Sequence, residues 1–318
     1  MSTLMVSVCV VTYNHARYIK DCLTSVLAQG EDVPLEILVG DDLSNDETGD
    51  IIAGLAARHP DVIRYFRHTE RQGPTANYLF LIREAKGKYI AHLDGDDFWL
   101  AGKLKRQVAL LEQHPECPAV YTNALAVDDQ GRALGIFNNL QPERFDINAL
   151  LRRGNFLNHS SLLYRARLGQ ALLDIAPPFL DYRIHLRLAR EGAVAYLNEV
   201  LVSYRVASSS SIIVHANDHV RQLYWEALLD VPVAQVDRKA LAGGMAEFMR
   251  SVVFRSARLQ SWSLVRKWWP QVLANAPEGR VMMVVRTVLA VLRTGLRLAV
   301  EEICRYVSGN GMKILYRR

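Results

Sequence analysis

The chain has 318 residues and a formal net charge of +5; half of its residues are hydrophobic and 22% are charged. This length and balance exclude a disordered chain and predict a globular protein of one large or two smaller domains. Four cysteines without CxxC spacing give no disulfide framework or zinc site, no run of about 18 uncharged apolar residues predicts a membrane span, and no signal-peptide pattern is found. We therefore expect a reducing, cytoplasmic location.

Apolar strands and amphipathic helices alternate through the first 118 residues. The first strand is apolar throughout, as expected for a strand buried on both faces of a sheet. The predicted strands are 6–11, 35–39, 62–66 and 89–93, and the predicted helices are 18–28, 46–57, 75–85 and 103–113. This order predicts the α/β class, with a mostly parallel, Rossmann-like sheet flanked by helices.

The pattern changes after Pro118. Strands 120–127 and 133–137 form a predicted hairpin, followed by a helix at 147–152, a strand at 160–164, a helix at 182–191 and two strands at 194–197 and 200–205. A serine patch at 208–211 is expected to be a linker. From about residue 219 onward only helical patterns occur, so an α-helical C-terminal region, 212–318, is predicted to follow residues 1–211.

Three carboxylates follow the strand at 89–93 within four residues: Asp94, Asp96 and Asp97. Carboxylates this close repel one another unless a cation lies between them. Mg²⁺ and Mn²⁺ are commonly held by one or two carboxylates and the phosphates of a substrate. The segment therefore favours a metal and diphosphate site at the carboxyl end of a strand, and the alternative is an acidic loop that caps the next helix.

Polar residues also follow the first two strands. Thr12, Tyr13 and Asn14 come with no glycine before Gly30, so a dinucleotide-binding turn is not supported. These residues either pack on a base or ribose or form an ordinary polar turn. Asp42 ends the second strand, where a carboxylate can accept the imide N–H of a pyrimidine.

Four motifs in the same order resemble the family 2 glycosyltransferases over roughly residues 5–206. They are the strand ending in Thr12-Tyr13-Asn14, the segment Gly40-Asp41-Asp42-x-Ser44-x-Asp46-x-Thr48, the stretch from Gly73 through Asn77 to Ile90, and Asp94-Gly-Asp-Asp-x-Trp99. The resemblance implies a GT-A fold in a catalytic domain at 1–211, with a nucleotide-sugar-binding half at 1–118 and an acceptor-side half at 119–211. It also implies a nucleotide-sugar donor and Mn²⁺ or Mg²⁺.

The family pattern assigns expected roles by position. Thr12, Tyr13 and Asn14 would line the nucleoside pocket, and Asp42 would contact the base. Asp97 is the first choice as direct metal ligand, with Asp96 also near the metal and Asp94 or Asp96 toward the ribose. Arg71 and Arg205 are expected phosphate contacts.

The resemblance places the catalytic base near the start of a helix in the second half, where Asp181 precedes Tyr182. The alternative role of Asp181 is an ordinary N-cap. Leu180 stands where many relatives have an acid, which leaves the base on Asp181 alone. On the acceptor side, His159 could hydrogen-bond the acceptor or be a structural residue, and Trp99 is expected to form part of the wall or to pack.

The segment 281–300, the main part of a predicted membrane-contacting stretch at 281–305, is strongly apolar but contains three arginines that fall within roughly 40° of one another on a helical wheel: Arg286, Arg293 and Arg297. This pattern favours a helix lying in an anionic membrane interface. Trp262, Trp268 and Trp269 add interfacial character. The alternative is a helical hairpin that packs on the catalytic domain or on a second subunit, as in a homo-oligomer. Nucleic acid is not an expected partner, because the basic residues alternate with aliphatic ones.

The sequence thus predicts an inverting glycosyltransferase that moves a sugar, with a UDP-sugar favoured, to a hydroxyl of a saccharide or lipid-linked saccharide. The resemblance implies cell-surface polysaccharide or lipopolysaccharide assembly, with the protein in the cytoplasm or peripheral on the cytoplasmic face of a bacterial inner membrane. The alternatives are a catalytically silent protein of the same fold and a nucleotidyltransferase. The latter needs a basic Gly-rich phosphate loop, which the turn at Thr12 does not offer.

Overall fold

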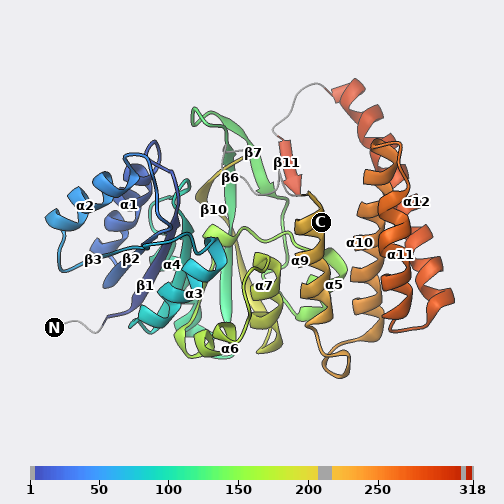
Figure 1. Ribbon diagram of the computed structural model, residues 1–318, viewed down its shortest axis with the longest axis horizontal. Coiled ribbons are helices and arrows are strands. Elements are labelled where there is room, and N and C mark those ends of the chain that lie inside the picture. Colours follow the sequence, from blue (N-terminus) through green and yellow to red (C-terminus); the bar gives the residue numbers. More distant parts are fainter. Residues whose placement is uncertain (1–3, 207–216, 309–312, 317–318) are drawn as a thin grey trace.

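The computed structural model describes residues 4–206, 217–308 and 313–316 and shows one large mixed sheet followed by a bundle of helices (Figure 1). The strands of the sheet's main path lie in the order β11-β7-β6-β9-β4-β1-β2-β3, and β10 pairs with β5, β6 and β8. Strands β1 to β4 run parallel, whereas β9 runs antiparallel to both β4 and β6. The predicted α/β class with a mostly parallel sheet flanked by helices is confirmed.

The elements that build the N-terminal half are β1 (Val6–Thr12), α1 (Ile19–Leu27), β2 (Leu35–Asp41), α2 (Thr48–Arg58), β3 (Ile63–Arg67), α3 (Pro74–Glu84), β4 (Tyr89–Asp94), β5 (Phe98–Trp99) and α4 (Lys103–Gln113). Residues 119–206 contain β6 (Ala119–Val127), β7 (Ala133–Asn138), β8 (Arg144–Phe145), α5 (Ile147–Arg153), β9 (Leu163–Arg165), α6 (Gly169–Leu173), α7 (Asp181–Arg190) and β10 (Val194–Arg205). The remaining elements are α9 (Asn217–Leu229), α10 (Arg238–Arg258), α11 (Ser263–Ala274), α12 (Arg280–Ser308) and β11 (Lys313–Tyr316).

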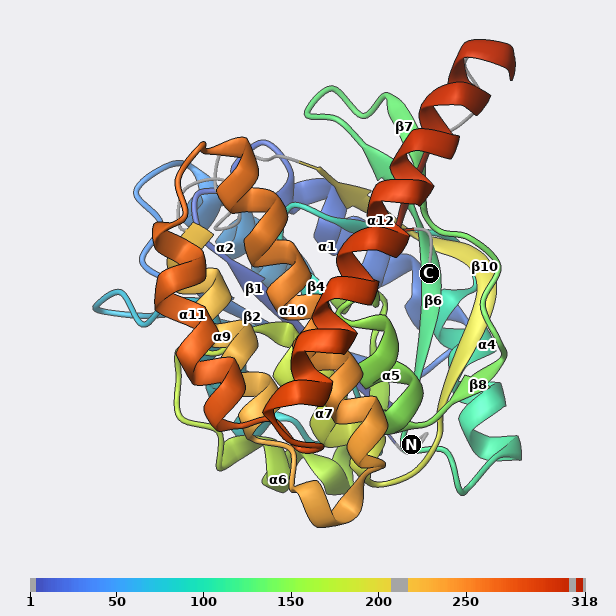
Figure 2. The same cartoon turned by 90° about the vertical axis from the view of Figure 1, so that its right-hand side faces the viewer.

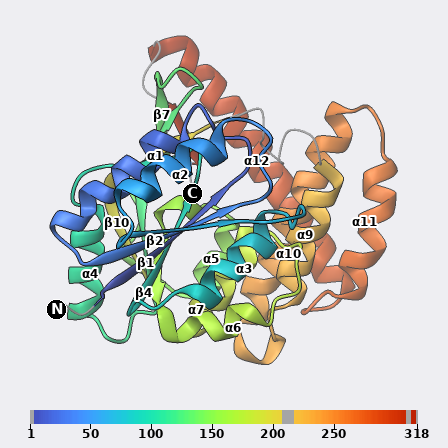
Figure 3. The same ribbon diagram turned by 60° about the vertical axis from the view of Figure 1, so that its left-hand side comes forward.

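Alternation along β1 sends side chains into two hydrophobic cores, one on each face of the sheet. Val6, Val8 and Val10 pack with α1, α2 and α4, whereas Cys9 and Val11 pack with α3, α6 and α7. Figure 3 shows these two helical layers on opposite sides of β1, β2 and β4. Burial on both faces explains why this strand is apolar at nearly every position.

The C-terminal helices share the second of these cores. Buried side chains of α9 and α10 belong to the same cluster as those of α5 and α7, and α10 packs between α5, α11 and α12 (Figure 2). Among the described residues, no helix has the length and apolar composition needed to cross a bilayer.

Four expectations about secondary structure are wrong in detail. The two strands expected at 194–197 and 200–205 are one strand, β10, with register irregularities between Leu197 and Val202. The strand expected at 160–164 is shorter, because His159–Ser161 forms a 3₁₀ turn before β9. The expectation of only helices after about residue 219 missed β11, which pairs with β7. Helix α2 begins at Thr48, two residues later than predicted, and Asp46 lies before it and accepts the backbone N–H of Thr48.

The aromatic and basic residues of the C-terminal region differ from the interfacial pattern expected of them. Trp268 is fully buried against Phe248, with ring centroids 5.0 Å apart, so it belongs to the core. Trp262 is exposed and Trp269 packs at the edge of the core. Arg286 pairs with Glu278 in the turn before α12, and Arg293 pairs with Glu247, so only the second pair joins α12 to α10. The predicted linker at 208–211 lies outside the described residues.

Candidate active site

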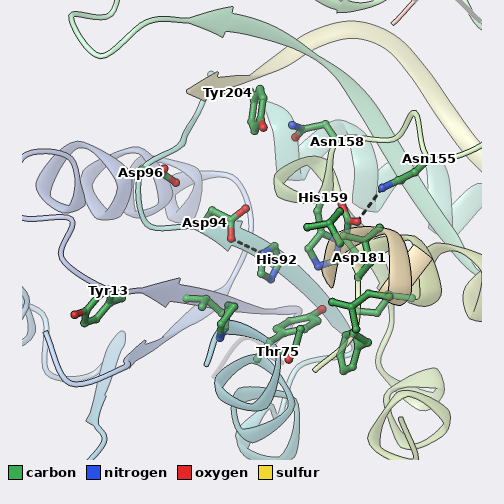
Figure 4. Close-up of a pocket in the computed structure, with 18 of the residues that line it drawn as sticks. Tyr13, Thr75, His92, Asp94, Asp96, Asn155, Asn158, His159, Asp181 and Tyr204 are labelled. Atoms are coloured by element: carbon green, nitrogen blue, oxygen red, sulfur yellow. Dashed lines mark hydrogen bonds and ion pairs between the residues drawn. The ribbon is translucent and has the colours of Figure 1, made fainter. Parts of the chain in front are cut away.

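A cavity of about 540 Å³ opens at the carboxyl ends of β1 and β4, where open α/β sheets bind ligands (Figure 4). One end is polar and carries Thr12, Tyr13, Asp42, Arg71, Asp94, Asp96 and Arg205. The far wall is formed by Leu157, Phe179, Leu180, Ile184, Leu223 and Tyr224. Asp181 and His159 lie between the two ends.

Asp42 organises the loop that forms the outer edge of the polar end. Its Oδ1 accepts the backbone N–H of Gln72 at 2.6 Å, and its Oδ2 accepts bonds from Arg71 Nε at 3.0 Å and from the backbone N–H of Gly73 at 3.1 Å. The Arg71 guanidinium lies over the Tyr13 ring, 3.3 Å from its centroid. Two oxygens have four acceptor positions, so Oδ1 retains one for a ligand.

Thr12 and Asn14, which the sequence grouped with Tyr13, have different positions. Thr12 is buried, borders the cavity and lies with its Oγ1 3.2 Å from His15 Nδ1. Asn14 has a positive φ of 54°, a conformation that asparagine tolerates better than most residues. Its Oδ1 accepts the backbone N–H of Asn45, and it is not part of the cavity lining, so it joins two loops instead.

Asp94 and Asp96 are the carboxylates of the acidic cluster that border the cavity. Asp94 Oδ1 accepts a bond from His92 Nε2 at 3.1 Å. Burial opposes ionisation of Asp94, but His92 and then His15 favour the carboxylate and leave its pKa below the ordinary value. Gly95 between the two acids allows a close approach to β1, because a Cβ there would lie 2.6 Å from Thr12 Oγ1.

Asp97 turns away from the cavity and into the protein. Its carboxylate accepts the Ser160 hydroxyl at 2.6 Å and the backbone N–H of Arg205 at 2.8 Å, and it is only 2% exposed. Burial, followed by the charges of Asp96 and Asp94, raises its pKa well above the usual range. This placement disagrees with the expectation that Asp97 is the first choice for a direct metal ligand.

The residues of the cavity offer only some of the ligands that a divalent cation needs. Among the described residues, no group of three or more histidine, cysteine, aspartate or glutamate side chains is arranged to enclose a metal. Asp94 and Asp96 nonetheless present carboxylate oxygens to the cavity, and one or two carboxylates suffice for Mg²⁺ or Mn²⁺ when substrate phosphates supply other ligands. The residues therefore fit a metal that arrives with a diphosphate.

Arg205 and Trp99 support the acidic loop from behind. The Arg205 side chain donates to the backbone oxygens of Asp96 at 3.1 Å and Asp128 at 2.7 Å, and it borders the cavity. Trp99 is buried, does not border the cavity, and donates its indole N–H to the backbone oxygen of Ser160 at 2.8 Å. Trp99 thus has a packing position rather than a place in the wall.

Asp181 is the first residue of α7 and faces the cavity. Its Oδ1 accepts Asn155 Nδ2 at 2.9 Å and the backbone N–H of Tyr182 at 2.8 Å. Burial raises its pKa to about 6; the two hydrogen bonds act against this rise, and the charge of Asp94 adds to it. A carboxyl with this pKa is ionised at neutral pH yet remains basic enough to take a proton.

Two histidines next to the site were missed by the sequence analysis: His92 and His185. His185 Nε2 lies 3.1 Å from Nδ1 of His159, and the ring centroids of His159 and His92 are 4.0 Å apart. Spacing could have found both, because His92 is two residues before Asp94 on a strand and His185 is four residues after Asp181 on a helix.

Comparison with known proteins gives the same family as the motifs. The family model described as "Glycosyl transferase family 2" matches residues 7–170. A putative teichuronic acid biosynthesis glycosyltransferase, TuaG of Bacillus subtilis, is 28% identical over 207 residues, covering 65% of this chain and 81% of TuaG.

Solved structures share the fold. Residues 1–349 of S. aureus TarS in complex with UDP-GlcNAc match with a TM-score of 0.55 and 17% identity over 92% of each chain. A longer TarS structure matches with a TM-score of 0.58 and 20% identity over 78% of this chain, and the match spans only 43% of its own length. The mannosyltransferase PcManGT from Pyrobaculum calidifontis, in complex with GDP-Man and Mn²⁺, matches with a TM-score of 0.53 and 19% identity over 92% of this chain and 88% of its own.

The family match covers more than half of the chain and includes the strands that carry Asp42, Asp94 and Asp96. The chain therefore belongs to glycosyl transferase family 2 and has the GT-A fold that its sequence motifs predicted.

Proposed function

We propose that this protein is an inverting glycosyltransferase that moves a sugar from a nucleoside diphosphate sugar to an acceptor hydroxyl. One observation carries the proposal: a single cavity holds a partly buried carboxylate suited to act as a base, Asp181, and a separate acidic and aromatic end suited to a nucleotide. The two ends supply the two things that such a transfer needs, a place for the leaving group and a proton acceptor for the attacking hydroxyl.

The polar end would hold the nucleotide. The acceptor position left on Asp42 Oδ1 suits the imide N–H of uracil, and the planar groups of Tyr13 and Arg71 offer stacking surfaces. The TarS complex contains UDP-GlcNAc, which supports a UDP-sugar as donor, although PcManGT contains GDP-Man. Arg71 and Arg205 are the cationic side chains that border this end and remain our proposed phosphate contacts.

Asp94 and Asp96 would hold Mn²⁺ or Mg²⁺ together with the diphosphate. This proposal moves the ligand role from Asp97 to Asp94, because Asp97 is committed to Ser160 and to the backbone of Arg205. The Mn²⁺ in the PcManGT complex supports metal use within this fold. When bound, the metal would offset the negative charge that develops on the departing diphosphate.

Asp181 would act as the general base. The carboxylate takes the proton of the acceptor hydroxyl while that oxygen forms a bond to the anomeric carbon of the donor sugar. The bond between the anomeric carbon and the diphosphate oxygen breaks on the opposite face, so the configuration inverts. Asn155 Nδ2 and the backbone N–H of Tyr182 both bind Oδ1, which leaves Oδ2 to receive the proton.

The acceptor would enter along the apolar wall. Phe179, Leu180 and Ile184 approach the base from the side of α7, and Leu223 and Tyr224 approach it from α9. A wall of this kind suits a saccharide that carries a lipid or another apolar group. The name of TuaG supports a role in cell-surface polysaccharide assembly, and lipopolysaccharide is a second possible destination.

The outer face of α12 supports attachment to an anionic membrane surface. Eight exposed apolar side chains lie on α12: Val281, Met282, Val284, Val285, Val288, Leu289, Leu292 and Leu296. Exposed Arg293 lies at the edge of this face, and residues 280–297 contain no acid. Apolar faces edged by arginines bind interfaces that contain anionic lipid. The alternative occupant of the face is a second copy of the chain.

Vesicle sedimentation tests the membrane proposal. The protein should sediment with phosphatidylglycerol vesicles, and replacing Leu289, Leu292 and Leu296 by serine should release it, whereas Leu134→Ser on β7 should not. A triple variant that sediments like the wild type would refute the membrane proposal. Loss of a dimer in light scattering, without any vesicle binding, would show that a second copy covers the face.

A donor-hydrolysis assay tests the catalytic proposal. In ¹H NMR, α-linked UDP-glucose, UDP-GlcNAc or GDP-mannose should release the nucleoside diphosphate together with the β-anomer of the sugar, and Asp181→Asn should abolish this release. Initial release of the α-anomer would contradict inversion. Release of pyrophosphate would indicate a nucleotidyltransferase, and absence of both binding and turnover would indicate a silent protein of the same fold.

A further inference from the structure

Three histidine rings contact one another between Asp94 and helix α7: His92 and His159, which border the cavity (Figure 4), and His185 on α7. His92 donates to Asp94 at 3.1 Å, its ring centroid lies 4.0 Å from that of His159, and His159 Nδ1 lies 3.1 Å from His185 Nε2. Tyr78 packs edge-on against both rings, with centroid separations of 4.5 Å to His92 and 5.6 Å to His159. The transfer mechanism above uses none of these imidazoles.

The contacts of His92 fix where its ring carries hydrogen. A carboxylate can only accept, so Nε2 of His92 carries the hydrogen toward Asp94. Its Nδ1 is buried and has no hydrogen-bond partner among the described residues. At a buried nitrogen of this kind, a lone pair is better tolerated than an N–H without an acceptor.

The same argument orients the bond between His159 and His185. Nδ1 of His185 is likewise buried without a partner among the described residues. If His159 donated, His185 would have to carry its hydrogen on this unpartnered Nδ1. If His185 donates from Nε2, its Nδ1 is a lone pair and no N–H is left unpaired. The second arrangement is therefore favoured.

This orientation decides what His159 presents to the cavity. Its Nδ1 accepts the hydrogen bond from His185 Nε2–H, so the hydrogen of a neutral His159 ring must be on Nε2. Nδ1 is thus occupied inside the protein, and His159 borders the cavity. Burial, followed by the neighbouring His92 and His185, lowers the pKa of His159, which keeps the ring neutral at physiological pH.

We propose that His159 is a fixed hydrogen-bond donor that binds a neutral oxygen of a sugar through Nε2–H, and that His185 is the positioning residue that sets this tautomer. The inference rests on the proposed function, because it assigns a ligand group to the same cavity. It changes the role of His159 from a general acceptor-side contact to a donor of one defined bond.

The surrounding charges indicate the chemical class of the bound oxygen. Asp181 lies next to His159 in the cavity, and no metal is proposed at this carboxylate, so its charge disfavours a phosphate beside the ring. A hydroxyl or an acetamido carbonyl is neutral and accepts an N–H. That oxygen belongs either to the transferred sugar or to the acceptor sugar, and kinetics can separate these two sources.

The tautomer can be observed directly in the wild-type chain. Long-range ¹H–¹⁵N correlation spectra of protein labelled with ¹⁵N-histidine distinguish the two tautomers, and loss of one signal set in His159→Gln assigns His159. We expect the Nε2–H form for His159 and His185. A His159 ring with its hydrogen on Nδ1, or one that is protonated at pH 7.5, would overturn the proposal.

Variants at position 185 test the positioning role. His185→Gln keeps an N–H that can reach His159 Nδ1 and should retain the His159 tautomer, whereas His185→Met has a similar volume but no donor. We expect mixed tautomers in His185→Met and a loss of about three- to tenfold in kcat/KM, with His185→Gln closer to the wild type. Equal effects of the two variants on the tautomer and on kcat/KM would contradict a positioning role.

Variants at position 159 identify the source of the oxygen. If the oxygen lies on the transferred sugar, His159→Met should weaken UDP-GlcNAc binding by about three- to tenfold, and His159→Gln less. If the oxygen lies on the acceptor, the same variants should instead raise the acceptor KM by these amounts. Affinity for UDP, which has no sugar at that position, should not change. Unchanged sugar-nucleotide affinity and acceptor KM in His159→Met would overturn the ligand role, whereas a wild type that binds no nucleotide or nucleotide sugar would overturn the proposed function itself.

Discussion

Asp181→Asn separates the catalytic role of this residue from its contribution to stability. The folded-state pKa of Asp181 is raised from 3.8 to about 6, so this carboxyl favours folding fully only below its unfolded pKa. That contribution is lost as pH rises through about 6. A rise of about 2 in pKa means that the ionised carboxylate destabilises the folded state by about 3 kcal/mol at neutral pH. Solvent in the cavity screens the charge and reduces this cost to about 1 to 3 kcal/mol.

Asparagine removes the buried charge while its oxygen can still accept the bonds from Asn155 and from the backbone of Tyr182. We therefore expect the variant to melt several degrees above the wild type at pH 7.5, and this difference to shrink as pH falls toward 5. Sugar transfer should fall by at least about 100-fold, because the base is lost. Calorimetric scans at both pH values and the hydrolysis assay measure the two effects.

Asp61→Asn is the matched control, because Asp61 is exposed and lies away from the cavity. It should change neither melting temperature nor turnover. Wild-type turnover in Asp181→Asn would refute its role as base. A loss of stability that is equal at pH 7.5 and pH 5 would refute the account of its buried charge.

Three further predictions concern pH, nucleotide binding and packing. The kcat/KM of the wild type should fall about tenfold per pH unit below about 6 as Asp181 is protonated, and a pH profile that stays flat between 5 and 8 would contradict this. Asp42→Asn should weaken UDP binding by about tenfold or more in titration calorimetry, because it disturbs both the base contact and the loop at 71–73, and an unchanged Kd would contradict the nucleoside site. Gly87→Ala should destabilise the fold by more than about 1 kcal/mol, because its Cβ would lie 2.6 Å from the backbone nitrogen of Ser7. Gly54→Ala, where a Cβ on α2 would meet no neighbouring atom within 4 Å, should stabilise the fold by up to about 1 kcal/mol. Equal melting temperatures of the two variants would contradict this packing.

The sequence predicted the N-terminal half well because local signals and tertiary environment agree there. The strands buried on both faces are mostly apolar, and acids stand at the carboxyl ends of β2 and β4. Strand β10 and strand β11 were harder to predict. Register irregularities within β10 break its alternation, and β11 exists only through its pairing with β7, far away in the chain.

The direction of each acid in the cluster was beyond sequence reasoning. Asp97 turns inward because Ser160 and the backbone of Arg205 bind it, and these partners are 63 and 108 residues away. The same limit applies to α12, where a helical wheel placed the arginines correctly on one stripe. It could not show that Arg286 and Arg293 pair with Glu278 and Glu247 on other parts of the chain.

A thermal-shift panel of UDP-, GDP-, dTDP- and CMP-sugars, each with and without Mn²⁺, tests the nucleotide-sugar site most directly. A ligand that binds only the folded state stabilises it by RT ln(1 + [L]/Kd), or about 2.7 kcal/mol at 100 times Kd. We predict a Mn²⁺-dependent rise in melting temperature with one nucleotide class, UDP-sugars first, that is lost in Asp42→Asn and Asp96→Asn. No shift with any donor, or the same shift in both variants, would contradict the site.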